Sequence, residues 1–339
     1  MGDIKSLLSK LTWLSWSHCP SKLNAINLCL KKLVVLELSQ SNMMEDWIGW
    51  EPCLVSKNLK VIQITGCPSF KRIPNFLKCL NLKKLVLQHC GALLAVDGSL
   101  AKLASLKHLE ISSSEYPPSE DCEIFVVPYA LGGLKSLSTL KIKGMHVQEL
   151  HHSLGEMTCL EYLSLECCRM PRPLPKSIGK LKSLLELELG GTEIRGLPHS
   201  IGDLKMLRKM SLVETRIDKL PDQMGGLESL HELDLRETSI TELPASIGNL
   251  KELEILHLTY SEIRELPKTI GMLENLKVLE ALGCRNLKGD IPSEIGCLSF
   301  FRILNLSLSN IRTLPVTMNQ LSHLQTLDLS LCHELEHLL

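Results

Sequence analysis

Residues 332–337 read Cys-His-Glu-Leu-Glu-His and contain the H-E-x-x-H pattern of zinc proteases. In those enzymes the pattern places two histidine ligands on one face of a helix, with the glutamate as general base. Here, aligning Cys332 with Cys67 puts Leu335 at the core position of Phe70, and no third ligand is near. We therefore expect repeat structure at this point, no metal site and no enzymatic activity.

Two other short motifs are weak signals. Residues 1–6 fit the loose M-G-x-x-x-[ST] pattern of N-myristoylation, but Asp3 makes a poor example, and the sequon Asn305-Leu306-Ser307 matters only in a secreted protein. Neither G-x-x-x-x-G-K-[ST] nor G-x-G-x-x-G occurs, so no nucleotide-binding loop is recognisable. The sequence predicts no catalytic residue, no cofactor and no membrane contact.

The elements that position every side chain come from one recurring phrase, Leu-x-x-Leu-x-Leu-x-x-(Cys/Thr/Ser), which returns about every 23 residues. Its fourteen copies begin at Leu11, Leu33, Leu59, Leu82, Leu106, Leu137, Leu160, Leu184, Leu207, Leu230, Leu253, Leu276, Phe301 and Leu324. This spacing is typical of leucine-rich repeats, in which each copy buries its leucines only against its neighbours. We predict one α/β domain over residues 1–339. It is a curved leucine-rich-repeat solenoid, or horseshoe, with a parallel β-sheet on the concave face and short helical or 3-10 turns on the convex face.

The clearest copies, over 184–279, continue with Leu-Pro-x-x-(Ile/Met)-Gly-x-Leu. The proline ends hydrogen bonding on the strand side, and the residues after it form one short turn. We expect the glycines of this turn to adopt a tight or left-handed backbone. They are Gly202, Gly225, Gly248 and Gly271.

The last position of the phrase accepts only small side chains with a hydrogen-bond donor. Six of the 13 cysteines stand there, at Cys19, Cys67, Cys90, Cys168, Cys284 and Cys332, and threonine or serine stands there in the other copies. Such a side chain can turn inward and bond the loop backbone at the strand end. We expect these cysteines to be structural thiols, reduced in a cytosolic setting.

Composition restricts the partners. Apolar residues make up 44% of the 339 residues, and the formal net charge of −1 offers nothing to attract nucleic acid or an anionic membrane. No apolar window is long enough for a membrane span, and no signal-peptide pattern opens the sequence. We expect a cytoplasmic or nucleocytoplasmic protein without a nucleic-acid or membrane partner.

Two stretches interrupt the period. The interval from Leu106 to Leu137 is 31 residues long and holds a polar segment, 112–121, that we expect to form a loop. The interval from Leu33 to Leu59 holds Trp47 and Trp50. These tryptophans either fill a wider layer of core or contact a neighbouring domain.

The residues between the core leucines of each strand face outward and form the predicted recognition surface. Those chosen as candidate protein-binding residues are Glu166, Glu186, Glu188, Lys209, Glu232, Asp234, Arg236, His257 and Glu280. This half is acidic, whereas the preceding half offers Lys84, His108, Lys141 and Lys143. We expect lysine at 186, 188, 232 and 234 to weaken partner binding without unfolding the protein; alternatively, the charges only keep the sheet soluble.

The units with Ile-x-x-Leu-Pro-x-x-Ile-Gly-x-Leu resemble the repeats of plant intracellular nucleotide-binding leucine-rich-repeat disease-resistance proteins. Segments 11–20, 33–39 and 58–67, with the two tryptophans, look like the opening repeats of the subclass that carries a Toll/interleukin-receptor domain. The resemblance covers essentially the whole chain. It implies a non-enzymatic module that senses a pathogen effector or a guarded host protein, or contacts adjacent receptor domains. Without polar terminal repeats, we expect a fragment of a longer receptor.

Two alternatives remain open. Leu-Pro-x-x-Ile-Gly-x-Leu units also occur in intracellular scaffolds of Ras signalling and in plant Ras-group repeat proteins, which implies binding of a small GTPase or kinase in signal transduction. One copy, residues 287–296, looks instead like the repeats of plant surface receptors. The signal peptide, paired cysteines and many sequons of those ectodomains do not appear in this sequence.

Overall fold

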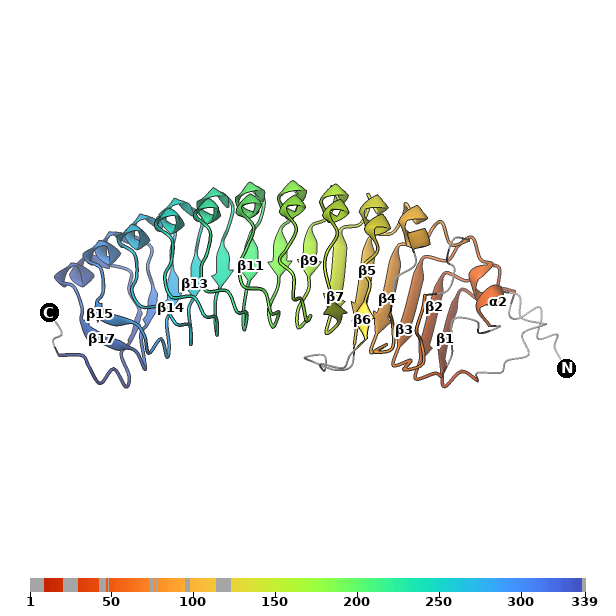
Figure 1. Ribbon diagram of the computed structural model, residues 1–339, viewed down its shortest axis with the longest axis horizontal. Helices are drawn as coiled ribbons and strands as arrows, with labels where there is room; N and C mark the ends of the chain where they lie inside the picture. Colours follow the sequence, from red (N-terminus) through yellow and green to blue (C-terminus); the bar gives the residue numbers. More distant parts are fainter. Residues whose placement is uncertain are drawn as a thin grey trace. The chain divides into compact units, whose positions relative to one another are not determined.

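The computed structural model describes residues 9–20, 30–42, 47, 49–73, 76, 78–94, 98–113 and 123–336 (Figure 1). They group into two compact units, residues 1–171 and 172–339. We refer to these as the N-terminal unit and the C-terminal unit. In both, one short strand and one short turn recur in each repeat.

The main strands of each unit pair in parallel and in chain order. Those of the N-terminal unit are β1 Trp13–Ser17, β2 Val35–Ser39, β3 Val61–Thr65, β4 Lys84–Gln88, β5 His108–Ser112, β7 Thr139–Lys143 and β9 Tyr162–Ser164. Those of the C-terminal unit are β10 Glu186–Glu188, β11 Lys209–Ser211, β12 Glu232–Asp234, β13 Ile255–His257, β14 Val278–Glu280, β16 Ile303–Asn305 and β18 Thr326–Asp328. Each strand falls on a copy of the sequence phrase, as predicted.

The alternation within the phrase creates the core. In β12 the central Leu233 is fully buried, whereas Glu232 before it is half-buried on the opposite face. Equivalent leucines stack from strand to strand, for example Leu233 on Leu256 and Leu256 on Leu279, because the parallel register places them opposite each other. A continuous leucine ladder therefore fills the interior of each unit.

Short helical segments return the chain to the next strand. They are α2 Trp50–Leu54 and the 3-10 turns η1 Gly98–Lys102, η2 Tyr129–Gly133, η3 His152–Glu156, η4 Lys176–Lys180, η5 His199–Asp203, η6 Asp222–Gly226, η7 Ala245–Asn249, η8 Lys268–Met272, η9 Ser293–Cys297 and η10 Val316–Gln320. Figure 1 shows the turns of each unit stacked in one row along the side away from the strand arrows. A proline precedes most of them, with the extended backbone that starts each turn.

The glycines lie in tight 3-10 turns, one of the two alternatives predicted, but their backbone is not left-handed. Gly202, Gly225, Gly248 and Gly271 are not among the glycines with positive φ, so they do not adopt a left-handed backbone. A Cβ atom at Gly248 would instead lie 2.7 Å from the carbonyl oxygen of Thr269 in the next turn. Glycine is required here because successive turns approach backbone to backbone.

The last residue of the phrase turns inward, as predicted. The hydroxyl of Thr215 donates to the carbonyl of Leu212 at 2.8 Å, and the thiol of Cys284 donates to that of Leu258 at 3.0 Å. Burial raises the pKa of the Cys90 and Cys168 thiols to about 12, which disfavours the reactive thiolate. The cysteines described in the structure are free thiols.

The two tryptophans fill the core, which decides between the two interpretations. Trp47 and Trp50 are each 5% exposed and meet edge to face with ring centroids 5.4 Å apart. Trp50 also packs against Phe70 and Phe76, while the indole of Trp47 donates to the carbonyl of Pro20 at 3.1 Å.

Each unit has a second, two-stranded ribbon: β6 Ile124–Phe125 with β8 His146–Val147, and β15 Lys288–Asp290 with β17 Asn310–Thr313. Strand β6 lies in the long interval between the fifth and sixth copies of the phrase. Most of the predicted 112–121 loop lies outside the described residues, so that prediction remains a prediction.

Candidate functional site

The outward residues of β10–β14 form one surface of the C-terminal unit. Parallel register aligns Glu186, Lys209 and Glu232 across three strands, and the same ladders align Glu188 with Asp234 through Ser211. It also aligns Asp234 with His257 and Glu280. The structure therefore brings eight of the nine candidate residues onto one face. The ninth, Glu166, follows β9 in the N-terminal unit, where Lys143 lies 3.3 Å from its carboxylate.

Lys209 stands among carboxylates at the centre of this face. Its Nζ lies 3.1 Å from Oε1 of Glu232 in the neighbouring strand. The hydrogen bond to Glu232 raises the pKa of Lys209, and the charges of Glu188 and Glu186 add to that shift. Three carboxylates, those of Glu186, Glu188 and Glu232, thus act on this one lysine.

Asp234 differs from the sequence-based expectation, because it is only 4% exposed. Its carboxylate accepts hydrogen bonds from Nε of Arg236 at 2.9 Å and from Nη2 at 2.6 Å, and also from the backbone N–H of Arg236. The aspartate thus caps the end of its own strand. The expectation that Asp234 is exposed to solvent is therefore wrong. Lysine at this position would bury an unpaired cation, so we now expect its reversal to destabilise the fold.

His257 and Glu280 form the next cross-strand pair, with Nδ1 of the histidine 3.1 Å from Oε2 of the glutamate. The histidine side chain is 20% exposed and carries charge only when protonated. The pKa of Arg236 is raised, mainly by its hydrogen bond to Asp234, and the charge of the Glu280 carboxylate adds to this shift. The charges of β12, β13 and β14 are therefore coupled into one network.

The N-terminal unit carries a carboxylate that the sequence analysis overlooked. Glu110 accepts a hydrogen bond from Nε2 of Gln88 at 2.7 Å and lies 3.3 Å from Nε2 of His108. The bond with His108 is the main cause that lowers the pKa of Glu110 to about 2. Its position between two core residues, Leu109 and Ile111, was the signal that it faces outward.

An outward apolar row was also overlooked. Ile255, Val278 and Ile303 occupy the first outward position of β13, β14 and β16, whereas the charged residues Glu186, Lys209 and Glu232 occupy this position in β10, β11 and β12. All three are half-buried. Reading one outward position down the repeats, rather than selecting charges, identifies this row.

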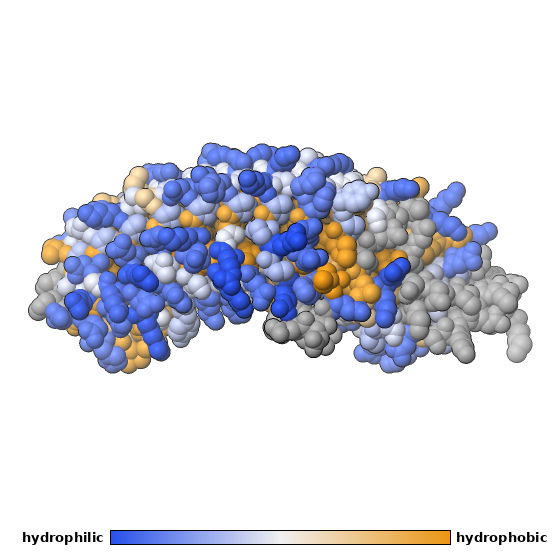
Figure 2. Space-filling model, viewed as in Figure 1, coloured by the Kyte–Doolittle hydropathy of each residue, from blue (hydrophilic) through white to orange (hydrophobic). Residues whose placement is uncertain are grey.

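Other apolar side chains are exposed in the N-terminal unit. Ile124 and Val126 are 42% and 55% exposed on either side of the buried Phe125. Figure 2 shows hydrophobic side chains gathered near β6 and β7 on the visible face, whereas hydrophilic side chains dominate over the repeats of the C-terminal unit.

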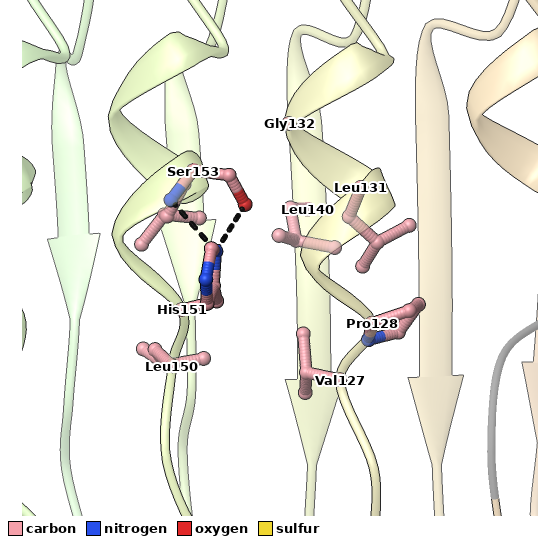
Figure 3. Close-up of a pocket in the computed structure, with 9 residues that line it drawn as sticks. Val127, Pro128, Leu131, Gly132, Leu140, Leu150, His151 and Ser153 are labelled. Carbon is pink, nitrogen blue, oxygen red and sulfur yellow. Dashed lines mark hydrogen bonds between the residues drawn. The ribbon is translucent and has the colours of Figure 1, made fainter. Parts of the chain in front are cut away.

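The described residues include a small cavity and a more open hollow. The small cavity, of about 10 Å³ and with room for a single water, lies between η2 and η3, where Pro128 and His151 line it (Figure 3). Ser153 and His151 meet here at 3.0 Å, but the hydroxyl of Ser153 donates to the carbonyl of Tyr129 at 2.5 Å. The serine is consequently held by backbone rather than activated by the histidine. A more open hollow of about 200 Å³ is lined by Lys288, Asn310, Arg312 and Glu334.

Residues 332–335 follow the repeat register rather than a zinc helix. The N–H of Leu335 donates to the carbonyl of Cys332 at 3.3 Å, just as Phe70 donates to Cys67 at 3.2 Å. His337 lies outside the described residues. Within the described part of the chain, no group of three histidine, cysteine or acidic side chains is arranged to hold a metal ion, and no helix there has the length and apolarity to cross a bilayer.

Comparison with known proteins agrees with this geometry. A family model described as a leucine-rich repeat region matches residues 152–234 and 198–288. A leucine-rich-repeat protein of Leptospira interrogans aligns over 96% of this chain and 85% of its own, with a TM-score of 0.72 at 22% identity. The chain has the fold of a leucine-rich-repeat solenoid. The fold class predicted from the sequence is confirmed.

Two disease-resistance proteins of Arabidopsis thaliana are similar in sequence. RPP4 is 29% identical over 102 residues, and RPS4B is 27% identical over 183 residues. These matches cover 30% and 53% of this chain. They span only 9% and 14% of the two relatives, which are far longer proteins.

Proposed function

We propose that this chain is the protein-recognition part of a plant intracellular immune receptor, belonging to the subclass with a Toll/interleukin-receptor domain. In this role it binds a pathogen effector, a guarded host protein or adjacent receptor domains, and it performs no catalysis. Its place is the cytoplasm or the nucleus. The observation that carries the proposal is the similarity of its repeats to disease-resistance proteins at 27–29% identity.

The outward face of β10–β14 supports this role. Parallel strands fix the backbone, so recognition rests on side chains that can vary without changing the core. Glu186, Lys209 and Glu232 illustrate this, because each projects from a strand whose central residue is fully buried. A face with paired charges and a local excess of carboxylates favours fast, salt-dependent association with a basic protein surface.

A plant assay tests the proposal. Disruption of the gene in its own plant should raise pathogen growth, and re-expression of the wild-type gene should restore resistance. A gene with Glu186, Glu188 and Glu232 changed to lysine should fail to restore resistance. A control gene with Glu37 and Glu156 changed to lysine should restore it. Unchanged pathogen growth after disruption, across a panel of strains, would overturn the immune role.

The competing function, a scaffold for a small GTPase or kinase, gives a different result. Binding to a GTPase should then depend on whether GTP or GDP is loaded, and disruption of the gene should leave resistance unaltered. Resistance is scored in the plants with the disrupted gene, and GTPase binding is measured with protein from the re-expressing plants.

A further inference from the structure

The apolar row of the C-terminal unit is confined to three neighbouring strands. Ile255 pairs in register with Val278, and Val278 with Ile303, while the alternate residues Leu256 and Leu279 are fully buried. Side chains at the same position of paired strands stand about 4.8 Å apart. The row therefore offers three branched aliphatic side chains, half-buried and side by side, on the outward face of the sheet.

Carboxylates adjoin the row. Beside it stands Glu280, whose side chain is 38% exposed and pairs with His257. Continuing the row toward β10, the same outward position holds Glu232, Lys209 and Glu186. Beside the row and along this direction the carboxylates are Glu186, Glu188, Glu232, Asp234 and Glu280, and they outnumber the cations, which are Arg208, Lys209 and Arg236.

The other flank of the row carries less charge. Glu254 and Lys277 neutralise each other there at 2.7 Å, which leaves Arg302 as a cation near Ile303. A complementary partner therefore needs aliphatic side chains over the row, with basic side chains beyond it in the direction of β10.

We propose that the face of β10–β16 binds an amphipathic α-helix of a protein partner, with aliphatic residues on Ile255, Val278 and Ile303 and with Lys or Arg near Glu280 and Glu232. This deepens, and rests on, the proposed recognition function by naming the chemistry of the partner segment. The spacing selects a helix. Residues i, i+3 and i+7 of a helix rise by about 4.5 and 10.5 Å, close to one and two strand spacings of about 4.8 Å. Alternate residues of an extended chain are about 6.6 Å apart, so they do not match the spacing of about 4.8 Å between successive strands.

A designed peptide can serve as the probe. A fluorescein-labelled helix of about 18 residues, roughly 27 Å long, spans the strands from β16 to β10. It carries leucine at i, i+3 and i+7, followed by two turns with lysine. Comparison peptides replace lysine by glutamate, replace leucine by serine, or place proline in the centre. Fluorescence anisotropy with the full chain gives each Kd at low and physiological salt.

The lysine peptide should bind, and more weakly as salt rises, while the three comparison peptides should bind at least roughly tenfold more weakly. Val278→Ser should raise Kd roughly tenfold by removing apolar contact, and Glu280→Gln should raise it several-fold. The matched controls are Val61→Ser in β3 and Glu37→Gln in β2, which occupy corresponding outward positions in the other unit and should change Kd less than about twofold. Circular dichroism melts confirm that each variant is folded.

Absence of binding to the lysine peptide, or equal binding of its glutamate version, would overturn the inference. So would an unchanged Kd for the folded Val278→Ser variant. Equal binding of the proline peptide would reject a helical partner. If the lysine peptide does not bind but resistance in plants is still lost with the Glu186, Glu188 and Glu232 substitutions, the inference is wrong and the proposed recognition function stands. If disruption of the gene also leaves resistance unchanged, both proposals fail.

Discussion

Arg236 closes over Asp234 with both Nε and Nη2 of its guanidinium, at 2.9 Å from Oδ1 and 2.6 Å from Oδ2, and the aspartate side chain is only 6% exposed. The two residues are separated by one position in the sequence, so the contact joins the end of a strand to the loop that follows it. Without the arginine side chain, the carboxylate would lose these two hydrogen bonds and keep the backbone N–H donation from residue 236.

Arg236→Ala should therefore destabilise the protein by about 1.5–3 kcal/mol, the range for hydrogen bonds to a charged group, because it removes the two side-chain hydrogen bonds to Asp234. Urea unfolding followed by circular dichroism measures it. Arg216→Ala is the matched control, because the 3.4 Å pair of Arg216 with Glu193 is exposed and should change stability by less than about 1 kcal/mol. Equal losses for both variants would contradict the capping role of Asp234.

Gly248→Ala should destabilise by about 1–3 kcal/mol, because the added methyl would meet the carbonyl oxygen of Thr269 at 2.7 Å and force two turns apart. Gly196→Ala provides the control. Its φ is not positive and a Cβ there meets nothing within 4 Å, so alanine should be neutral or stabilise by about 0.4–1 kcal/mol. Thermal melts should show a lower Tm for Gly248→Ala and an unchanged or higher Tm for Gly196→Ala. An unchanged Tm for Gly248→Ala would contradict the close approach of the two turns.

The repeats were predictable because strand position follows from leucine spacing alone. Leu233 lies in the core whatever its neighbours are, since every copy of the phrase presents it in the same register. The inward hydroxyl of Thr215 was predictable for the same reason. The role of Gly248 was not, because the sequence does not show how closely successive turns approach.

The sequence predicted which residues of the candidate surface face outward, but not which of them contact one another. Lys209 and Glu232 are 23 residues apart, and only the parallel register together with the rotamers brings their charges to 3.1 Å. Asp234 looked outward by its place in the phrase, yet the guanidinium two residues later covers it. Selecting charged residues also hid Val278, whose importance depends on its aliphatic neighbours in the adjacent strands.

The aromatic cluster of the N-terminal unit gives a third prediction. Trp50→Ala should destabilise by about 3–5 kcal/mol, because the indole is 5% exposed and contacts Trp47, Phe70 and Phe76. Trp13→Ala is the control, since Trp13 is 61% exposed on the outer face of β1 and should cost less than about 1 kcal/mol. The comparison uses urea midpoints, and similar shifts for both tryptophans would show that the cluster is not core.

Glu110 predicts how stability depends on pH. Its pKa in the folded protein is about 2, below the ordinary value of 4.5, so the folded state binds this proton more weakly than the unfolded state. The contribution of Glu110 to the free energy of unfolding is therefore complete above about pH 4.5 and is lost as the pH falls toward about 2.

Urea unfolding across that range should show a stability advantage of wild type over Glu110→Gln that shrinks with falling pH. His108→Ala should remove most of this pH dependence and Gln88→Ala a smaller part, because the bond with His108 is the largest cause of the shift. A constant difference between wild type and Glu110→Gln from about pH 5 to about pH 2.5 would show that the carboxylate is not held in its charged form by these partners.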